Sequence, residues 1–532
     1  MKGFLKKAKA ELEDILDSNK KSTQSATRSS PDGPNYIQEP TPVDILRYRY
    51  HHGTNLGSIY VIERWLHPSC FPDDASGSSE LASVKAWVDK IGIEDTRKHF
   101  EQRWADAVSD EDIRWLQETA KCTTIRLPIG YFDLDPSFTQ GTPFEPYAAV
   151  YTGAWSSIWT LISRLRAHSI GTLIDLHALP GGANPNEHSG TNFGTTELWT
   201  SHTNRNLGVQ CCQFIAQEIN KGLDVAGVQI VNEAEWDSEH MYEWYDDCID
   251  AISIINPNIP VAISDGWNLG RAVEYSLKKN SAYPSKPTCP VVIDTHYYWA
   301  FSDEDKQKSP QQIISEVNNK LAELDGREGS VVDRGAVQVI VGEYSCVLTE
   351  DSWAKSGDAP KSELVKQFGQ AQSQRYQARS GGAFFWTWKM DWFPGGEWGF
   401  AEQANNGAIV PHHFQSTPPH EISEIVERAR RNLNDRMYSA VNQHVSYWQH
   451  HAPNMGGEHW RFEAGYKIGY NDALIFFEGR GQQAIAGGNR IGNVELWILK
   501  RIRESGFKGN FVWEFEQGMR RGVQDFQGIV GV

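Results

Sequence analysis

Eight short apolar runs, separated by helical patterns and mostly ending in polar residues, constrain this fold more than any other feature of the sequence. The runs cover residues 55–62, 122–127, 171–177, 226–232, 260–264, 290–296, 337–343 and 383–388. The main helical patterns cover residues 80–90, 150–168, 205–221, 240–255, 311–324 and 361–379. This alternation is typical of repeated βα units around a parallel sheet. We therefore predict an α/β fold, a (β/α)8 TIM barrel. A doubly wound sheet is the alternative, but no Gly-rich phosphate loop follows any run.

The two ends of the chain differ from this repeating middle. Residues 1–46 are expected to form an N-terminal amphipathic helix and a disordered linker, because the stretch 18–43 is rich in Ser, Thr, Pro and charge. The barrel, which carries the candidate catalytic residues, is predicted to span residues 47–430. Residues 431–532 are predicted to form a mainly helical C-terminal extension.

The C-terminal extension contains a weak internal repeat. "WRFEAGYKIG" begins at residue 460 and "WEFEQGMRRG" begins at residue 513, so both follow a W-x-F-E-x-G-x-x-x-G pattern. Two similar amphipathic segments predict paired helices, since one such helix cannot bury its apolar face alone. Glu463 and Glu516 of the repeat are expected to make contacts at helix ends or between helices.

Charge and cysteine usage exclude several classes of protein. The chain has 51 Lys and Arg against 68 Asp and Glu, a net charge of −17, which argues against nucleic acid as a partner. Its seven Cys form no CxxC or Cys/His motif, so we expect reduced core thiols and no disulfide framework or zinc motif. No signal peptide or membrane span is visible, and we predict a cytoplasmic location. A frayed N-terminal helix is favoured over a membrane contact. The oligomeric state is left open.

Polar residues at the ends of the apolar runs are the candidates for chemistry. In a parallel barrel the carboxyl ends of the strands converge on one open face. The residues concerned are Glu63, Arg126, His177, Asn232, Glu233, Asp265, His296, Tyr298, Glu343 and Trp386. A purely structural barrel would show no such concentration of Glu, His and Arg at strand ends. We therefore predict an active site at this face.

Two of these residues suit the hydrolysis of a glycosidic bond. That reaction needs one carboxyl group that protonates the leaving oxygen and a second that meets the developing oxocarbenium carbon. Glu233 and Glu343 end the fourth and seventh runs and form the natural pair. As general acid, Glu233 is expected to have a raised pKa. No metal or cofactor is expected, and Glu235 is expected to be a loop residue at the mouth.

The other residues can be given supporting roles. Asn232 would contact the sugar 2-hydroxyl, Tyr298 would hydrogen-bond the nucleophile, and Arg126 would keep Glu343 ionised. The remaining pocket residues would contact hydroxyl groups or the ring face: His177, His296 and Trp386. For each His taken alone, a satisfied core residue is the simpler interpretation.

Seven motifs of the barrel resemble glycoside hydrolase family 5, and within it the fungal exo-β-1,3-glucanase branch. They are "GTNLGSIYVIERW" (53–65), "IRLPIGY" (125–131), "IDLHALPGG" (174–182), "VNEAE" (231–235), "IDTHYYWAF" (293–301), "VGEYS" (341–345) and "FFWTWK" (384–389). The resemblance implies a retaining mechanism with Glu233 as acid/base and Glu343 as nucleophile. It also implies a pocket for terminal glucose formed by Glu63, Arg126, His177, Asn232, His296, Tyr298 and Trp386, with Phe301 clamping the next sugar.

The loop 181–190 departs from the secreted enzymes of that branch. Asn186, Glu187 and His188 stand where those enzymes carry Phe-Asp-Asn. With the C-terminal extension and no visible secretion signal, the chain is more similar to the long intracellular fungal members. The predicted activity is that of a β-glucosidase releasing terminal glucose from β-1,3-glucan oligosaccharides. The altered loop favours sterol, lipid or secondary-metabolite glucosides as the alternative substrates. A catalytically silent carbohydrate-binding barrel would be expected to lack one of the carboxylates.

Overall fold

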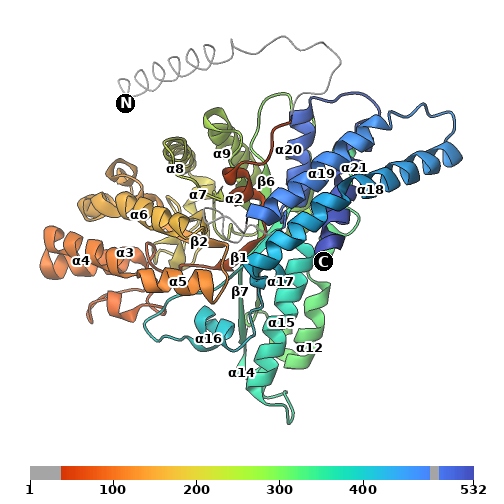
Figure 1. The fold of residues 1–532 in the computed structure, drawn as a ribbon. Helices are drawn as coiled ribbons and strands as arrows, with labels where there is room; N and C mark the ends of the chain where they lie inside the picture. The colour runs from red at the N-terminus through yellow and green to blue at the C-terminus, as the bar shows by residue number, and fades with distance from the viewer. Residues whose placement is uncertain (1–36, 480–489, 532) are drawn as a thin grey trace, which may run out of the picture.

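Eight parallel strands form the centre of the molecule (Figure 1). The computed structural model describes residues 37–479 and 490–531, so the amphipathic helix expected within residues 1–46 lies outside the described residues. The hydrogen-bonded order is β1-β8-β7-β6-β5-β4-β3-β2. A parallel bridge between Asn55 and Arg126 joins the two edges and nearly closes the barrel. The predicted (β/α)8 barrel is therefore confirmed.

The strands agree with the predicted runs in seven of eight cases. Their bounds are β1 His51–Thr54, β2 Thr124–Gly130, β3 Gly171–Ala178, β4 Gly227–Gln229, β5 Val261–Ser264, β6 Val291–Trp299, β7 Val339–Leu348 and β8 Gly382–Phe385. The exception is the first strand, which was predicted over residues 55–62. The sequence His-His-Gly-Thr of β1 does not look apolar, yet the whole strand is buried. His51 and His52 are accommodated because each has a buried hydrogen-bond partner, Thr124 Oγ1 and the Ala120 carbonyl oxygen.

Helices surround this barrel (Figure 1). The longer ones are α3 Glu80–Ile91, α4 Ile93–Asp106, α5 Asp110–Glu118, α6 Ala154–Ala167, α8 His202–Asn220, α9 Met241–Ile255, α10 Leu269–Lys279 and α15 Lys361–Arg379. The shorter ones are α2 Pro42–Tyr48, α7 Glu197–Thr200, α11 Asp303–Gln307, α12 Pro310–Glu316, α13 Val331–Arg334, α14 Glu350–Trp353, α16 Phe400–Asn405 and α17 His413–Ser416. The pattern predicted over 311–324 is interrupted, because α12 ends at Glu316 and Leu321 takes a left-handed φ of 62°. None of the described helices is both long and apolar enough to cross a membrane.

Four further helices cover the end of the barrel where the strands begin. They are α18 Pro419–His451, α19 Trp460–Glu478, α20 Val494–Ser505 and α21 Val512–Val530. Their apolar side chains share one buried cluster with residues near the strand starts, among them Leu173, Ala262 and Val292. This places the helices opposite the carboxyl ends of the strands. The expected domain boundary at residue 430 falls inside α18, and the one at residue 46 falls inside α2.

The repeated W-x-F-E-x-G-x-x-x-G pattern forms a close contact between α19 and α21, which lie side by side (Figure 1). A Cβ atom added at Gly518 would lie 2.1 Å from the Phe462 carbonyl oxygen, and one at Gly522 would lie 2.3 Å from that of Tyr466. Gly465 of α19 is equally close to the backbone of α21. The repeat therefore marks a helix pair in which each backbone approaches a glycine of the other helix.

Of the two glutamates of the repeat, Glu516 makes a contact between helices, as expected, whereas Glu463 forms an ion pair within its own helix. Glu516 accepts hydrogen bonds from the backbone N–H groups of Val331 and Val332 at 2.8 and 2.9 Å, at the start of α13. Glu463 pairs with Lys467 one turn further along α19. Glu516 thus connects the C-terminal helices to the barrel.

We expect Gly518→Ala to lower the free energy of unfolding by about 1 to 3 kcal/mol, because the added methyl group separates α19 from α21. Gly528→Ala is the matched control in the same helix, since a Cβ there meets no atom within 4 Å. It should raise stability slightly, by about 0.5 to 1 kcal/mol. Urea unfolding of both variants measures the difference. Equal stabilities would show that the glycine contact does not hold the helices together.

Candidate active site

A cavity of about 600 Å³ lies at the carboxyl ends of the strands. It is lined by Glu63, Trp65, His177, Asn186, Glu187, His188, Asn232, Glu233, Trp267, Tyr298, Phe301, Glu343, Trp386 and Trp398. Asp265 does not line it, but eight of the ten residues predicted as catalytic or sugar-binding, a set that includes Phe301, do. The other two, Arg126 and His296, are buried and contact its carboxylates. The fold therefore gathers all ten predicted residues in one place.

The two candidate carboxyl groups face each other across this cavity. Glu343 lies within β7, and Glu233 follows β4 by four residues. The backbone of Glu233 has a left-handed φ of 42°, and its carbonyl oxygen accepts a hydrogen bond from Asn184 Nδ2 at 3.2 Å. An oxygen of each carboxylate lies within 4.8 Å of the other. This close approach of two acids is the central feature of the site.

Glu343 is held by hydrogen bonds to both of its oxygens. Arg126 Nη1 donates to Oε1 at 2.8 Å, and the Tyr298 hydroxyl donates to Oε2 at 2.7 Å. Both contacts were predicted. A carboxylate fixed in this way has little freedom to rotate.

Arg126 connects Glu343 to a buried polar network at the bottom of the cavity. Its Nη2 lies 3.0 Å from Asp175 Oδ2 and donates to Asn232 Oδ1 at 2.7 Å. Burial by itself lowers the pKa of Arg126, but the carboxylates of Asp175, Glu343 and Asp294 raise it above its usual range. The guanidinium therefore stays charged although the side chain is fully buried.

The environment of Glu233 differs from what the sequence suggested. Its Oε1 lies 2.9 Å from His296 Nδ1, while His296 Nε2 lies 2.9 Å from Asp294 Oδ2. Burial raises the pKa of Glu233, but the hydrogen bond from His296 and the positive charges of the neighbouring histidines lower it to about 2. Burial lowers the pKa of His296, but Glu343 and Asp294 raise it well above its ordinary value. The expectation of a raised pKa for Glu233 is therefore wrong, because the hydrogen bond and positive charge of His296 stabilise the ionised carboxylate.

The inner wall of the cavity combines polar groups with a flat aromatic face. His177 Nδ1 lies 2.7 Å from Asp175 Oδ2, and its ring stacks on Trp386 at 5.8 Å with an interplanar angle of 9°. Asn232 Nδ2 lies 3.4 Å from His177 Nε2. Glu63 accepts a hydrogen bond from Trp65 Nε1 at 2.9 Å. A ring that presents hydroxyl groups at its edge and apolar C–H groups on its face suits this wall.

Two family models match this chain. The one described as cellulase (glycosyl hydrolase family 5) matches residues 84–391, which hold nine of the ten predicted site residues. The one described as the C-terminal domain of glucan 1,3-beta-glucosidase 3 matches residues 429–530.

This chain belongs to glycosyl hydrolase family 5. It is an O-glycosyl hydrolase, as the two carboxyl groups predicted.

Relatives of this family 5 chain match along nearly its whole length. An uncharacterized glycosyl hydrolase of Saccharomyces cerevisiae is 31% identical over 91% of this chain and 92% of its own length. Glucan 1,3-beta-glucosidase 3 of Schizosaccharomyces pombe is 28% identical over 90% of this chain and 95% of its own length. The crystal structure of a rutinosidase from Aspergillus niger has a TM-score of 0.52 at 18% identity, covering 68% of this chain and 98% of that structure. The last comparison shows agreement in fold.

His188 contacts Glu233 in the cavity, and sequence reasoning missed this contact. Its Nε2 lies 3.3 Å from Glu233 Oε2, so the acid is contacted by His188 on one oxygen and by His296 on the other. The sequence marked the loop 181–190 as unusual, but it did not show that the loop turns back onto Glu233. Trp65, Trp267 and Trp398 were missed because they follow no predicted strand directly.

The mouth of the cavity carries exposed aromatic side chains. Phe301 is 66% exposed and packs edge-on against Tyr298 at 5.6 Å, while Trp267 is 51% exposed. Glu235 is exposed in the loop behind Glu233, and its N–H donates to the Ala183 carbonyl oxygen at 3.0 Å. The mouth therefore offers apolar surface to whatever is attached to the sugar.

Glu233, His296 and Glu343 also lie close enough to surround a cation, since one atom of each is within 4.8 Å of the others. A metal ligand must be a neutral imidazole with a free nitrogen. Both His296 nitrogens already contact carboxylates, and the pKa of His296 is raised because of them. This histidine is thus an imidazolium ion that neutralises acids.

We expect Glu63 to make stability depend on pH. Burial raises the pKa of Glu63 from 4.5 to about 7. Between these values the unfolded chain releases this proton while the folded chain keeps it, so the contribution of Glu63 to stability falls as pH rises. Relative to wild type, Glu63→Gln should therefore gain about 3 kcal/mol between pH 4 and pH 8. Urea unfolding at both values measures this, with Glu235→Gln as the exposed control. A pH-independent difference for Glu63→Gln would contradict the assignment.

Proposed function

We propose that the chain is an exo-acting β-glucosidase that releases terminal glucose with retention of configuration. The observation that carries this proposal is the approach of Glu233 and Glu343 to within 4.8 Å. Retaining glycosidases hold their two carboxyl groups about 5 to 5.5 Å apart, whereas inverting enzymes leave roughly 6.5 to 9.5 Å for a water molecule. The proposed nucleophile is Glu343, and the proposed acid/base is Glu233.

In the first step, Glu343 attacks the anomeric carbon and Glu233 protonates the departing glycosidic oxygen. The hydrogen bonds from Arg126 and Tyr298 support ionised Glu343 as the nucleophile. In the second step, Glu233 takes a proton from water, which then releases glucose from Glu343.

The proton for the first step is proposed to come from the His296–Glu233 pair. His296 Nδ1 lies 2.9 Å from Glu233 Oε1, so transfer of one proton along this hydrogen bond gives neutral imidazole and protonated Glu233. Substrate binding displaces water from the cavity, which favours neutral over charged groups. This transfer turns an imidazolium and a carboxylate into two neutral groups, so the net charge of the pair does not change.

The terminal glucose is proposed to occupy the inner part of the cavity. Asn232 would contact its 2-hydroxyl, while Glu63, His177 and His296 would form hydrogen bonds with other hydroxyl groups. Trp386, which is buried beside His177, would support the ring face. Phe301 at the mouth would contact the group attached to glucose.

Two classes of β-glucoside are candidate substrates, and a different observation supports each. The Schizosaccharomyces pombe relative, a glucan 1,3-beta-glucosidase that matches 90% of this chain, supports β-1,3-linked glucan oligosaccharides. The loop residues Asn186, Glu187 and His188 line the cavity, and Trp267 and Phe301 add exposed aromatic surface. These features support a glucoside with an apolar aglycone, such as a sterol, lipid or secondary-metabolite glucoside, as the second candidate.

Two measurements test the proposed function. Proton NMR of the first product formed from a β-glucoside should show β-glucose before mutarotation. Initial production of α-glucose would contradict the retaining assignment. A comparison of kcat/KM for laminari-oligosaccharides with that for sterol and lipid glucosides then decides between the two substrate classes.

The organisation of the chain is proposed to follow its helices. We place the start of the C-terminal unit at α18, because this helix runs without interruption through residue 430.

All seven Cys are buried and unpaired, which agrees with the expected core thiols. The cytoplasmic location stays a prediction of the sequence.

A further inference from the structure

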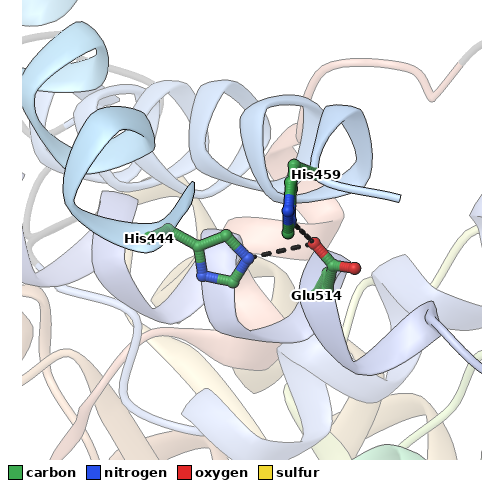
Figure 2. Close-up of side chains that lie close together, drawn as sticks. All are labelled: His444, His459 and Glu514. Atoms are coloured by element: carbon green, nitrogen blue, oxygen red, sulfur yellow. Dashed lines mark hydrogen bonds and ion pairs between the residues drawn. The ribbon is translucent and has the colours of Figure 1, made fainter. Parts of the chain in front are cut away.

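Three metal-ligating side chains meet in the C-terminal helices, which contribute no residue to the active-site cavity. His444 comes from α18, His459 immediately precedes α19, and Glu514 lies in the first turn of α21. His444 Nε2 lies 3.0 Å from Glu514 Oε2, and His459 Nδ1 lies 2.8 Å from the same oxygen. Figure 2 shows both rings directed at this one oxygen atom.

The carboxylate of Glu514 has no fixed positive partner. Its side chain is fully buried, and His444 is 5% and His459 25% exposed. Among the residues that the structure describes, no Lys or Arg forms an ion pair with Glu514. A buried carboxylate is costly unless a cation balances its charge. A metal ion between the carboxylate and the two imidazoles would supply that charge.

Several contacts orient the three side chains. The N–H of Glu458 donates to Glu514 Oε1 at 2.7 Å, which leaves Oε2 for the two imidazoles. The His444 ring stacks on Phe462 at 4.0 Å with an interplanar angle of 17°. Ligand side chains in metal sites are usually fixed by contacts of this kind.

We propose that His444, His459 and Glu514 bind one divalent transition-metal ion of the zinc class. Two imidazoles and one carboxylate form a common ligand set for such ions. The three ligand atoms lie within 4.8 Å of one another, and bonds of about 2.0 to 2.2 Å in tetrahedral geometry place such atoms roughly 3.3 Å apart. His444 also lines a surface cavity of about 560 Å³, which brings one side of the cluster close to the surface.

The proposed ion stabilises the C-terminal helices. Its three ligands come from the end of α18 and from the starts of α19 and α21, so the ion links segments that are separated in the sequence. Metal binding to a site that exists in the folded chain alone adds directly to folding stability.

Isothermal titration of the chelator-treated full chain with zinc chloride tests the proposal. We expect one ion per chain and a Tm raised by roughly 4 °C or more when zinc saturates the site. In His459→Ala the affinity should fall about 100-fold or more, and cobalt(II) should lose the visible absorption of a tetrahedral complex. The control is His451→Ala, at an exposed histidine of α18, the helix that carries His444, and this variant should bind zinc as wild type does.

Two outcomes would overturn the proposal. If wild type binds no zinc and its Tm does not change when a chelator is added, the cluster is a hydrogen-bonded network without a metal ion. If zinc binding survives His459→Ala but is lost in Glu343→Gln, the ion occupies the active-site group instead. Circular dichroism of each variant shows that the chain remains folded during these measurements.

Discussion

Glu343→Gln is expected to reduce kcat for β-glucoside hydrolysis by about 10⁴-fold or more, because an amide cannot form the glycosyl ester. Its fold should persist, since glutamine fills the same volume and its amide oxygen can still accept the hydrogen bond from Arg126, while its NH2 group can donate to the Tyr298 hydroxyl oxygen. The measurement is release of a chromogenic aglycone, with circular dichroism to verify folding. Hydrolysis at the wild-type rate would remove Glu343 from the mechanism.

Glu233→Gln separates the two carboxyl roles within the same experiment. Loss of the acid should lower the rate of hydrolysis most for substrates whose leaving group needs a proton, and least for activated aryl glucosides. With an activated substrate, the glycosyl-enzyme should accumulate, because no base is present to activate water, and an added anion such as azide should restore turnover. Glu235→Gln is the neighbouring control and should keep nearly full activity. If the two variants at 233 and 343 behave alike with all leaving groups, the assignment of roles is wrong.

Arg126→Met is expected to lower the free energy of unfolding by about 3 to 5 kcal/mol. The guanidinium lies between the buried carboxylates of Asp175 and Glu343, 3.0 and 2.8 Å away. Its removal leaves these charges without compensation at the bottom of the cavity, and activity should fall as well because Glu343 loses the hydrogen bond that positions it.

Urea unfolding measures the effect of Arg126→Met on stability. The control is Arg164→Met, whose partner Asp110 is 72% exposed, and which should change stability by less than about 1 kcal/mol. A similar small effect at both positions would mean that Arg126 does not balance the buried acids.

The candidate catalytic residues could be predicted from the sequence because the strand ends of a parallel barrel converge on one face. Asn232 with Glu233 after one buried run, and Glu343 at the end of another, were enough to predict a two-carboxylate site. The position of β1 was not readable, since His51 and His52 are buried beside hydrogen-bond partners from other segments. The alternation of apolar and polar residues within a segment does not show which hydrogen-bond partners distant segments will supply.

The proton positions depend on the tertiary structure. From the sequence, Glu233 needed a raised pKa to act as an acid. In the folded chain His296 lies between Glu233 and Asp294, so the imidazole holds the proton. His188 also contacts Glu233, because the loop 181–190 turns back onto this acid. No local sequence pattern specifies that turn.

The sequence by itself determined the barrel, its two carboxyl groups and the paired C-terminal helices, because these depend on local periodicity and on residues at strand ends. The tertiary structure decided which side chains contact those carboxyl groups and where the C-terminal helices lie. It also brought His444, His459 and Glu514 to within 4.8 Å of one another. Such contacts join segments far apart in the chain, and their distances follow from packing rather than from spacing in the sequence.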